Sequence, residues 1–399
     1  MRLLVLLPCQ PFPAYNGQTH RLALVARSLA ERHHVALAAL VEPGQKAEID
    51  AATRALFAEI ALAPLEPPAP GLSEALGQRL SSNPADVYRF RSDAMAAHVA
   101  GLVARHDPEA ILVGDPALTP YVEGLAGRAL VLDYVCEVTL QLERIAALAG
   151  PIERPLWSLR RAKYARFLKR IEPLYDAAFL NSREDVEALA RIWPRAKLLH
   201  VANGLDLTAY PLGLAAPVAD RLIYPGSIGY PPNRDAVAWF AAEVLPLIRA
   251  ERPEVTLRVT GAVPPGTEIE APGVVLTGRV EDVRLEIAAA TATVVPLRLG
   301  AGGARFKVIE SMALGTPLVG TAVGIEGLEL TDGTDYLAAE TAADFAAATL
   351  RLLGDPALSA RIAAGGRRRM ERDYDWNTHF RTLEARIEAS IRRPSAIAI

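Results

Sequence analysis

Short apolar segments alternate with amphipathic ones along almost the whole chain, and this alternation limits the choice of fold more than any other feature. Residues 2–7 read RLLVLL and residues 110–113 read AILV. Strands with almost no polar position are typical of a parallel sheet, because the helices that connect parallel strands cover both of its faces. The chain is therefore predicted to be α/β, with doubly wound parallel sheets.

The alternation is interrupted at residues 202–220, which read ANGLDLTAYPLGLAAPVAD and have no helical period. We interpret this stretch as a linker between an N-terminal domain, 1–201, and a C-terminal domain, 221–375, since 399 residues suffice for two cores. The predicted strands lie near 2–7, 34–40, 57–62, 110–113, 129–132, 177–181, 197–201, 221–225, 255–260, 274–277, 291–295, 317–320 and 335–338. The predicted helices lie near 18–32, 85–105, 153–174, 183–192, 233–250, 281–289, 304–314, 341–353, 356–371 and 376–392.

The composition excludes several classes of protein. With 51% apolar and 22% charged residues and a net charge of -3, the chain is typical of a globular protein and gives no reason to expect a nucleic-acid partner. Cys9 and Cys136 are the only cysteines, which excludes a disulfide framework and a cysteine-built zinc site. No apolar run approaches the roughly 18 residues that cross a bilayer, and the apolar opening ends at Pro8, which favours a first strand over a signal peptide. The sequence thus predicts a soluble protein of the reducing cytoplasm.

The most informative segment is 291–321, TATVVPLRLGAGGARFKVIESMALGTPLVGT, in which an apolar strand runs through a glycine-rich turn into a helix. Three glycines and three cations share this turn: Gly300, Gly302, Gly303, Arg298, Arg305 and Lys307. Glycines let the backbone approach an anion, and the free N–H groups of a helix start favour negative charge. The turn suits a diphosphate. A tight strand–helix turn with solvated arginines is the alternative.

Glu310 favours the diphosphate interpretation. On a helix that starts near 304, Gly303, Lys307 and Glu310 lie roughly along one face. A carboxylate one to two turns below a phosphate site is well placed to hold a ribose diol. The alternative is a surface pair with Lys307, although Lys before Glu is the less favourable order for such a pair.

Seven segments carry a resemblance to a known family. In the second half of the chain they are KVIESMALGTPLVGTAVGIEGL (307–328), YPGSIGYPPNRDAVAWFAAEVLPLI (224–248), LRVTG (257–261) and VVLTGRVEDV (274–283). In the first half they are PFPAYNGQTHRLALVARSLAERHHV (11–35), FLNSREDVEAL (179–189) and HVANGLDLTAY (200–210). The first set resembles the donor-binding signature, and the second set the upstream motifs, of the retaining family 4 glycosyltransferases (glycosyl transferases group 1). The resemblance covers nearly the whole chain. It implies a GT-B fold, in which two Rossmann-like domains face each other across a cleft and the last helix, 376–393, packs back on the N-terminal domain.

The resemblance also implies an activity: transfer of a sugar from a nucleotide-diphosphate donor to an acceptor hydroxyl, with retention of configuration and without a metal ion. The nucleotide sugar is then a co-substrate, and no cofactor is expected. The acceptor is a glycan, a lipid-linked sugar or a small molecule. A nucleotide-sugar epimerase of the same fold and a catalytically silent nucleotide-binding scaffold are the alternatives.

The family pattern assigns donor binding to Gly17, Gly226, Ser227, Arg279, Val280, Gly303, Arg305, Phe306, Lys307 and Glu310. By the resemblance, Gly17 faces the diphosphate and the acceptor, and Arg279 and Val280 lie against the nucleobase. Arg305, Phe306 and Lys307 present N–H groups and charge to the phosphates, so that Arg305 and Lys307 are also catalytic candidates. Glu310 holds the ribose.

The chain departs from the family pattern at three places. Gly302 stands where the first glutamate of the usual two-glutamate motif is expected. A stretch with Asn233 and Arg234 replaces the usual arginine and lysine after the first strand of the C-terminal domain. Val135 and Cys136 replace a histidine or carboxamide, and Asp133 and Glu137 are the nearest polar side chains. Gly302 is the feature that motivates the scaffold alternative.

Three further signals have competing interpretations. His20 lies just past Gly17 and could reach the acceptor, which makes it a catalytic candidate, or it is structural. The segment 157–170, WSLRRAKYARFLKR, is a helix with a solvated basic face, or it rests on the inner face of an anionic membrane. Asp373 and Asp375 have the spacing of a metal-binding pair, but their place before a helix favours capping.

Overall fold

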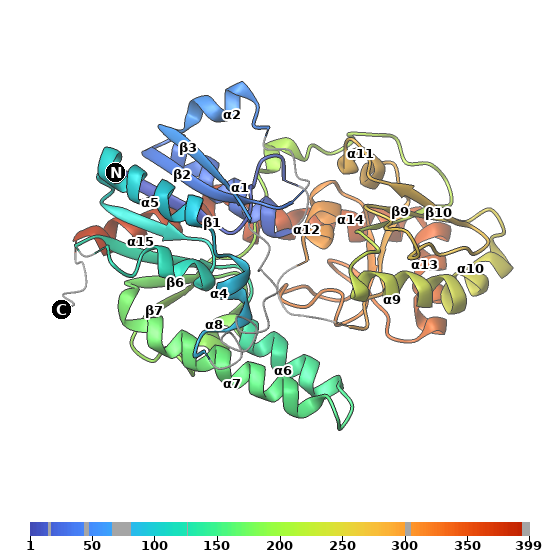
Figure 1. Ribbon diagram of the computed structural model, residues 1–399. Coiled ribbons are helices and arrows are strands. Elements are labelled where there is room, and N and C mark those ends of the chain that lie inside the picture. The colour runs from blue at the N-terminus through green and yellow to red at the C-terminus, as the bar shows by residue number, and fades with distance from the viewer. Residues whose placement is uncertain (15–16, 44–47, 66–80, 126, 300–304, 393–399) are drawn as a thin grey trace. The chain divides into compact units, whose positions relative to one another are not determined.

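The computed structural model describes residues 1–14, 17–43, 48–65, 81–125, 127–299 and 305–392 (Figure 1). The chain divides into two compact units. The first consists of Met1–Ala202 and the C-terminal residues from Phe380, and the second is Asn203–His379. Each unit contains one parallel sheet with connecting helices, which confirms the predicted fold class.

The sheet of the first unit has seven strands in the order β3-β2-β1-β4-β5-β6-β7. These strands are β1 (Arg2–Leu7), β2 (His34–Val41), β3 (Glu59–Pro64), β4 (Ala110–Val113), β5 (Ala129–Tyr134), β6 (Ala177–Leu180) and β7 (Lys197–His200). The helices of this unit are α1 (Gly17–Ala30), α2 (Ala51–Leu56), α4 (Ala85–Arg89), α5 (Asp93–His106), α6 (Val138–Leu148), α7 (Arg154–Ile171) and α8 (Arg183–Ala190), with 3-10 turns η1 (Pro116–Tyr121) and η2 (Glu172–Leu174). Helix α15 (Trp376–Arg392) belongs to this unit from Phe380 onward.

The sheet of the second unit has six strands in the order β10-β9-β8-β11-β12-β13. These strands are β8 (Arg221–Pro225), β9 (Thr256–Thr260), β10 (Val274–Gly278), β11 (Ala292–Val295), β12 (Leu318–Gly320) and β13 (Leu337–Ala338). Its helices are α9 (Pro231–Trp239), α10 (Leu245–Glu251), α11 (Val283–Ala288), α12 (Phe306–Ala313), α13 (Ala342–Gly354) and α14 (Pro356–Asp373), with a 3-10 turn η3 (Leu207–Ala209) and a π-helical turn η4 (Phe240–Val244).

The apolar strands are buried on both faces, as the sequence pattern predicts. Leu4 and Leu6 of β1 join one core cluster with Val99 of α5 and Phe167 of α7, while the alternate residue Val5 is equally buried on the other side. This double burial fixes the sheet between its connecting helices and leaves the carboxyl ends of the strands for ligands.

Residues 203–220, which we expected to form a linker, are part of the second unit. Leu205 forms a β-bridge with Asp375, and Tyr210 is buried. At the other end of the chain, Glu384 of α15 accepts hydrogen bonds from Arg32 and His33, each at 2.8 Å, within the first unit.

Two predicted helices are interrupted. The segment 85–105 forms α4 and α5, because the Ser92 side chain accepts a hydrogen bond from the Met95 amide and starts a new helix. The segment 233–250 forms α9, the π-helical turn η4 and α10, and Pro246, which has no N–H to donate, lies in the first turn of α10.

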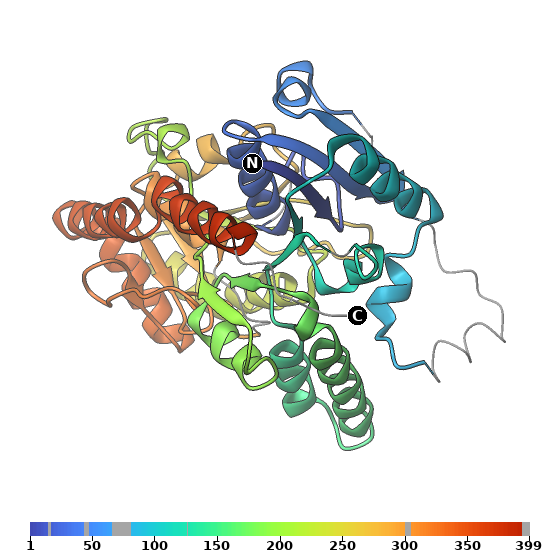
Figure 2. The same ribbon diagram turned by 90° about the vertical axis from the view of Figure 1, so that its left-hand side faces the viewer.

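Helices α6 and α7 lie side by side as an antiparallel hairpin whose connecting loop is at the end remote from the sheet of its own unit (Figure 1, Figure 2). The sequence pattern did not reveal α6, whose first turn is capped by the carboxylate of Glu137. Among the described residues, no helix combines the length and the apolar character that a bilayer crossing requires.

Candidate functional site

Helix α12 of the second unit begins at Phe306, with Arg305 at its N-cap position. Gly300, Gly302 and Gly303 of the predicted glycine-rich turn lie outside the described residues. Val308, Ile309 and Met312 are buried in the core, which fixes the orientation of the helix. Lys307 and Glu310 are the two charged residues of α12, and each has a specific partner.

Lys307 reaches a pair of polar side chains near the carboxyl end of β8. Its ammonium donates a hydrogen bond to Asn233 Oδ1 at 3.0 Å and lies 3.9 Å from the centroid of the Tyr224 ring. Burial, together with the nearby positive charge of Arg305, places the pKa of Lys307 well below its usual range. An anion bound beside Lys307 would act in the opposite direction and favour its charged form.

Asn233 connects these groups to the turn after β8. Its Oδ1 also accepts a hydrogen bond from the Tyr224 hydroxyl at 2.7 Å, and its Nδ2 donates to the Ser227 carbonyl at 2.8 Å. A Cβ on Gly226 would come within 2.9 Å of both Asn233 Nδ2 and Lys307 Nζ, so the glycine makes room for this contact. The structure thus brings together Gly226, Ser227 and Lys307, three residues that the sequence predicted.

Glu310 is buried one turn after Lys307, with 6% of its surface exposed. Its Oε1 accepts a hydrogen bond from the Tyr210 hydroxyl at 2.9 Å. Burial raises the pKa of Glu310 to about 7, although the Tyr210 hydrogen bond and the charge of Arg284 act in the opposite direction. The alternative of an exposed surface pair with Lys307 is wrong, because Glu310 is buried and Lys307 is bonded to Asn233.

The other residues that the sequence predicts to bind the donor lie in the segments that follow strands β10 and β11. Arg305 is mostly buried, and its guanidinium lies 3.5 Å from the Glu326 carboxylate. Phe306 is the first residue of α12. Arg279, which is exposed, and Val280 follow β10 directly.

Gly17 and His20 belong to the first unit, where Gly17 is the first residue of α1. Burial lowers the pKa of His20, which favours a neutral imidazole at physiological pH. The next residue, Arg21, is buried and pairs with Asp133 at 2.6 Å while donating to the Val201 carbonyl at 2.7 Å. Asp133, which lies near the place of the family's histidine or carboxamide, is therefore bound to an arginine of its own unit.

The two aspartates before α15 are each bound to other groups of the second unit. Asp373 lies 2.7 Å from Arg372 and 2.9 Å from Arg369, and these arginines lower its pKa to about 2. Asp375 accepts hydrogen bonds from the backbone and side-chain amides of Asn377 at the start of the helix. Within the described residues, no group of three or more His, Cys, Asp or Glu side chains is arranged to hold a metal ion.

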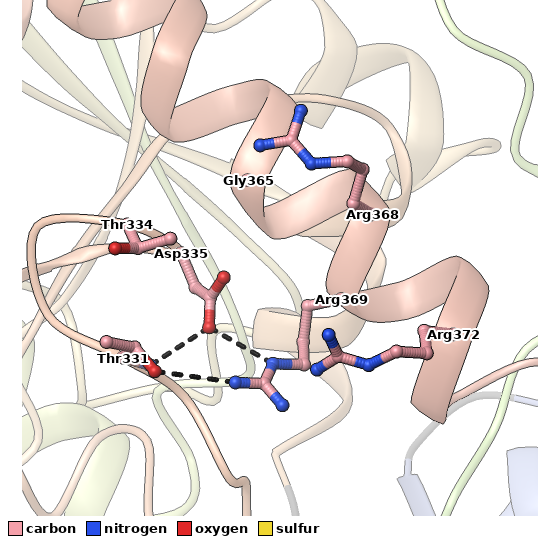
Figure 3. Close-up of a pocket in the computed structure, with 7 residues that line it drawn as sticks. All are labelled: Thr331, Thr334, Asp335, Gly365, Arg368, Arg369 and Arg372. Atoms are coloured by element: carbon pink, nitrogen blue, oxygen red, sulfur yellow. Dashed lines mark hydrogen bonds and ion pairs between the residues drawn. The ribbon is translucent and has the colours of Figure 1, made fainter.

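A cavity of about 150 Å³ lies beside α14, lined by Thr331, Thr334, Asp335, Gly365, Arg368, Arg369 and Arg372 (Figure 3). None of the predicted site residues lines it. Asp335 and Thr331 bind the guanidinium of Arg369, and the Gly365 Cβ position would collide with the Thr334 carbonyl. We interpret this cluster as the connection between α14 and the loop before β13.

Sequence reasoning missed three of the residues that shape this site. Tyr210 and Tyr224 were quoted only as parts of motifs, and Arg284 was not singled out. Asn233 was noted as a departure from the family pattern, not as a partner of Lys307. One signal was available for two of these residues: Tyr224 is a polar aromatic side chain at the carboxyl end of the apolar strand β8, and Asn233 lies in the first turn of the helix that follows it.

Known proteins resemble both the second unit and the whole chain. Residues 219–355 match the family model "Glycosyl transferases group 1". Glycogen synthase of Mycobacterium tuberculosis is 27% identical over 216 residues, which cover 50% of this chain and 50% of that enzyme. The chain thus spans about half of the length of the curated relatives that it matches.

Two solved structures show the fold. Sucrose-phosphate synthase from Thermosynechococcus elongatus aligns with a TM-score of 0.70 and 17% identity over 98% of this chain and 100% of that one. HepE of Anabaena, in complex with UDP-glucose, aligns with a TM-score of 0.65 and 15% identity over 97% and 99% of the two chains. The chain therefore has a GT-B fold of two Rossmann-like domains, and its second unit carries a Glycosyl transferases group 1 domain.

Proposed function

We propose that the chain is a glycosyltransferase that moves a sugar from a nucleotide-diphosphate donor to an acceptor hydroxyl, with retention of configuration and without a metal ion. The observation that carries this proposal is the pair of charges on α12: the Lys307 ammonium beside the Gly226–Ser227 turn, and the Glu310 carboxylate one turn further on. The proteins named above include a glycogen synthase, a sucrose-phosphate synthase and a protein solved with UDP-glucose, which supports transfer from a nucleotide sugar.

In this reaction the bond between the anomeric carbon and the diphosphate oxygen breaks, and its electron pair goes to the diphosphate. The acceptor oxygen forms the new bond on the same face of the sugar, and its proton leaves with the diphosphate. Lys307 and Arg305 stabilise the charge that grows on the leaving group, an effect that is strongest where water is excluded. His20, near Gly17, is proposed to contact the acceptor, whose hydroxyl must be positioned for attack.

Glu310 is proposed to bind the ribose of the donor. A carboxylate accepts hydrogen bonds only, and two ribose hydroxyls are matching donors. With a pKa of about 7, Glu310 is about half ionised at neutral pH and becomes fully ionised above it, and the ionised form is the one that this role requires. Arg279 and Val280, on the loop after β10, are proposed to lie against the base.

The departures from the family pattern do not remove the cation that this chemistry needs. The usual arginine and lysine after β8 are missing, but Lys307 reaches the same turn from α12 and is held there by Asn233. The charge would thus come from a different element. This arrangement favours an active enzyme over a silent scaffold.

We propose further that the α6–α7 hairpin contacts an anionic membrane surface that presents the acceptor. Ile152, Leu156 and Leu159 at the start of α7 and just before it are 92%, 50% and 61% exposed. Basic side chains surround them, and the Arg160 guanidinium stacks 4.7 Å from the centroid of the Trp157 ring. Apolar side chains flanked by arginines suit the interface of an anionic bilayer. This surface begins earlier in α7 than the segment 157–170 that the sequence indicated.

The test is a panel of nucleotide sugars, first by thermal shift and then by release of nucleoside diphosphate with and without candidate acceptors. A donor at a hundred times its dissociation constant stabilises the protein by about 2.7 kcal/mol. Transfer, or slow hydrolysis of one donor without an acceptor, is expected. Conversion of the donor to an epimer without an acceptor would assign an epimerase instead, and binding without any turnover would assign a scaffold.

A further inference from the structure

The partner of Glu310 comes from a segment far away in the sequence. Tyr210 follows η3, a hundred residues before Glu310, and its hydroxyl donates to Glu310 Oε1 at 2.9 Å. Both side chains are buried, with 7% of Tyr210 and 6% of Glu310 exposed. A hydrogen bond between an uncharged donor and a buried carboxylate stabilises the ionised form.

Tyr210 is itself held in place by two arginines. Arg367 of α14 donates to the Tyr210 carbonyl at 2.7 Å, and Arg284 of α11 donates to the preceding carbonyl, Ala209, at 2.7 Å. The Arg284 guanidinium also lies 5.9 Å from the centroid of the Tyr210 ring. The backbone on both sides of the ring is therefore fixed, and the hydroxyl is directed at the carboxylate.

The polar groups that act on Glu310 all belong to the second unit. They are the neutral Tyr210 hydroxyl and two charged side chains, Arg284 and Asp282, which form a salt bridge at 2.7 Å. Since Asp282 neutralises Arg284, the direct donor to the Glu310 carboxylate is the tyrosine hydroxyl. Lys307, on the same helix, is bonded to Asn233.

We propose that Tyr210 is a positioning residue for nucleotide binding: its hydroxyl orients the Glu310 carboxylate so that Oε2 and the remaining lone pair of Oε1 accept hydrogen bonds from the two ribose hydroxyls. The inference rests on the proposed function, because it assumes that Glu310 binds a ribose. It makes the recognised ligand a ribonucleoside diphosphate and disfavours the 2'-deoxy form. Tyr210 acts through Glu310 and does not touch the nucleotide.

The experiment is a double-mutant cycle of Tyr210→Phe and Glu310→Gln, with binding measured by calorimetry for whichever of UDP, ADP and GDP binds best and for its 2'-deoxy form. The ratio of the two dissociation constants is followed from about pH 5 to about pH 9, since charges on the diphosphate and on Lys307 affect both ligands equally. Tyr175→Phe is the matched control. Tyr175 lies in the first unit, and its buried hydroxyl is hydrogen-bonded at 2.8 Å to Thr119 of the same unit.

Tyr210→Phe is expected to weaken the ribonucleotide about tenfold and the 2'-deoxy form much less. The midpoint of the pH dependence of the ratio is expected to rise by about one unit, because the carboxylate loses a hydrogen bond to its ionised form. In the Glu310→Gln background the pH dependence disappears, and Tyr210→Phe costs no further affinity. Tyr175→Phe behaves as wild type.

Two sets of outcomes separate this inference from the proposed function. If Glu310→Gln weakens binding while Tyr210→Phe stays within about twofold of wild type, or if Tyr210→Phe costs the same in both backgrounds, the positioning role is wrong and the ribose role stands. If no nucleoside diphosphate binds, or Glu310→Gln binds as wild type does, the proposed function fails as well. Should Tyr210→Phe melt below the assay temperature, Tyr210→Met, which also lacks the hydroxyl, serves in the same cycle.

Discussion

The Nζ of Lys307 lies 3.9 Å from the centroid of the Tyr224 ring, so that the amine of α12 is packed on the face of the aromatic side chain of β8. A cation on an aromatic face is stabilised by the ring quadrupole, most strongly when both are desolvated. This contact with the Tyr224 ring offsets only part of the free energy that burying the charge costs, since the pKa of Lys307 remains well below its usual range. A buried amine whose pKa is strongly lowered, close to the end of a strand, is a candidate for a functional role.

Lys307→Met is expected to stabilise the protein and to weaken the preference for a diphosphate. Because the folded pKa of Lys307 is lower than the unfolded value, the unfolded chain binds more protons, and stability rises with pH up to about 10.5 in the wild type. The variant should melt at a higher temperature near neutral pH and lack this part of the rise. Calorimetry should show that the ratio of the affinities for a nucleoside diphosphate and for its nucleoside falls about tenfold or more, while Arg305 retains part of the preference. An unchanged ratio would place the diphosphate away from Lys307.

Asn233→Asp tests how Lys307 is held. A carboxylate at this position keeps the bond to Nζ, loses the donor to the Ser227 carbonyl, and adds a negative charge that competes with the diphosphate. Affinity for the nucleoside diphosphate should fall about tenfold or more, and affinity for the nucleoside should stay the same. Equal losses for both ligands would indicate a local unfolding of the turn rather than an electrostatic effect.

The sequence allowed every strand of both sheets to be placed, because short continuous apolar runs between amphipathic segments are typical of the strands of a parallel sheet. The ends of the helices were harder to predict. A cap at Ser92 divides one predicted helix into two, and Pro246 changes the backbone hydrogen bonds within another. The strand-end positions of Gly226, Ser227 and Lys307 were also predictable. Which groups bind Lys307 and Glu310 was not, because Asn233 and Tyr210 reach them through tertiary contacts that no local pattern encodes.

Metal independence is the next expectation. Asp373 is paired with Arg369 and Arg372, and Lys307 and Arg305 are proposed to supply the positive charge that a metal ion would otherwise provide at the diphosphate. Transfer or donor hydrolysis should therefore persist in excess EDTA. Loss of activity in EDTA that manganese restores would contradict the proposed role of these two cations.

Membrane contact depends on both the apolar and the basic side chains of the α6–α7 hairpin. Co-sedimentation with vesicles should require anionic lipid and decrease with added salt, because the attraction is screened within about 10 Å at 0.1 M. Leu156→Glu and Leu159→Glu should release the protein. Leu247→Glu, at a position of the second unit that is 45% exposed, is the control and should bind as wild type does. If the wild type does not bind at low salt, the hairpin has a solvated basic face only.

The most direct test of the account is the affinity of Glu310→Gln for a ribonucleoside diphosphate. The substitution keeps the shape of a side chain that is buried against Tyr210, so the fold should persist, and a melting curve checks this. A charge-assisted hydrogen bond contributes about 1.5–3 kcal/mol, so affinity should fall roughly tenfold to a hundredfold, while the 2'-deoxy ligand, already weak, should lose little more. Wild-type affinity of Glu310→Gln for the ribonucleoside diphosphate would contradict the ribose role and, with it, the site proposed on α12.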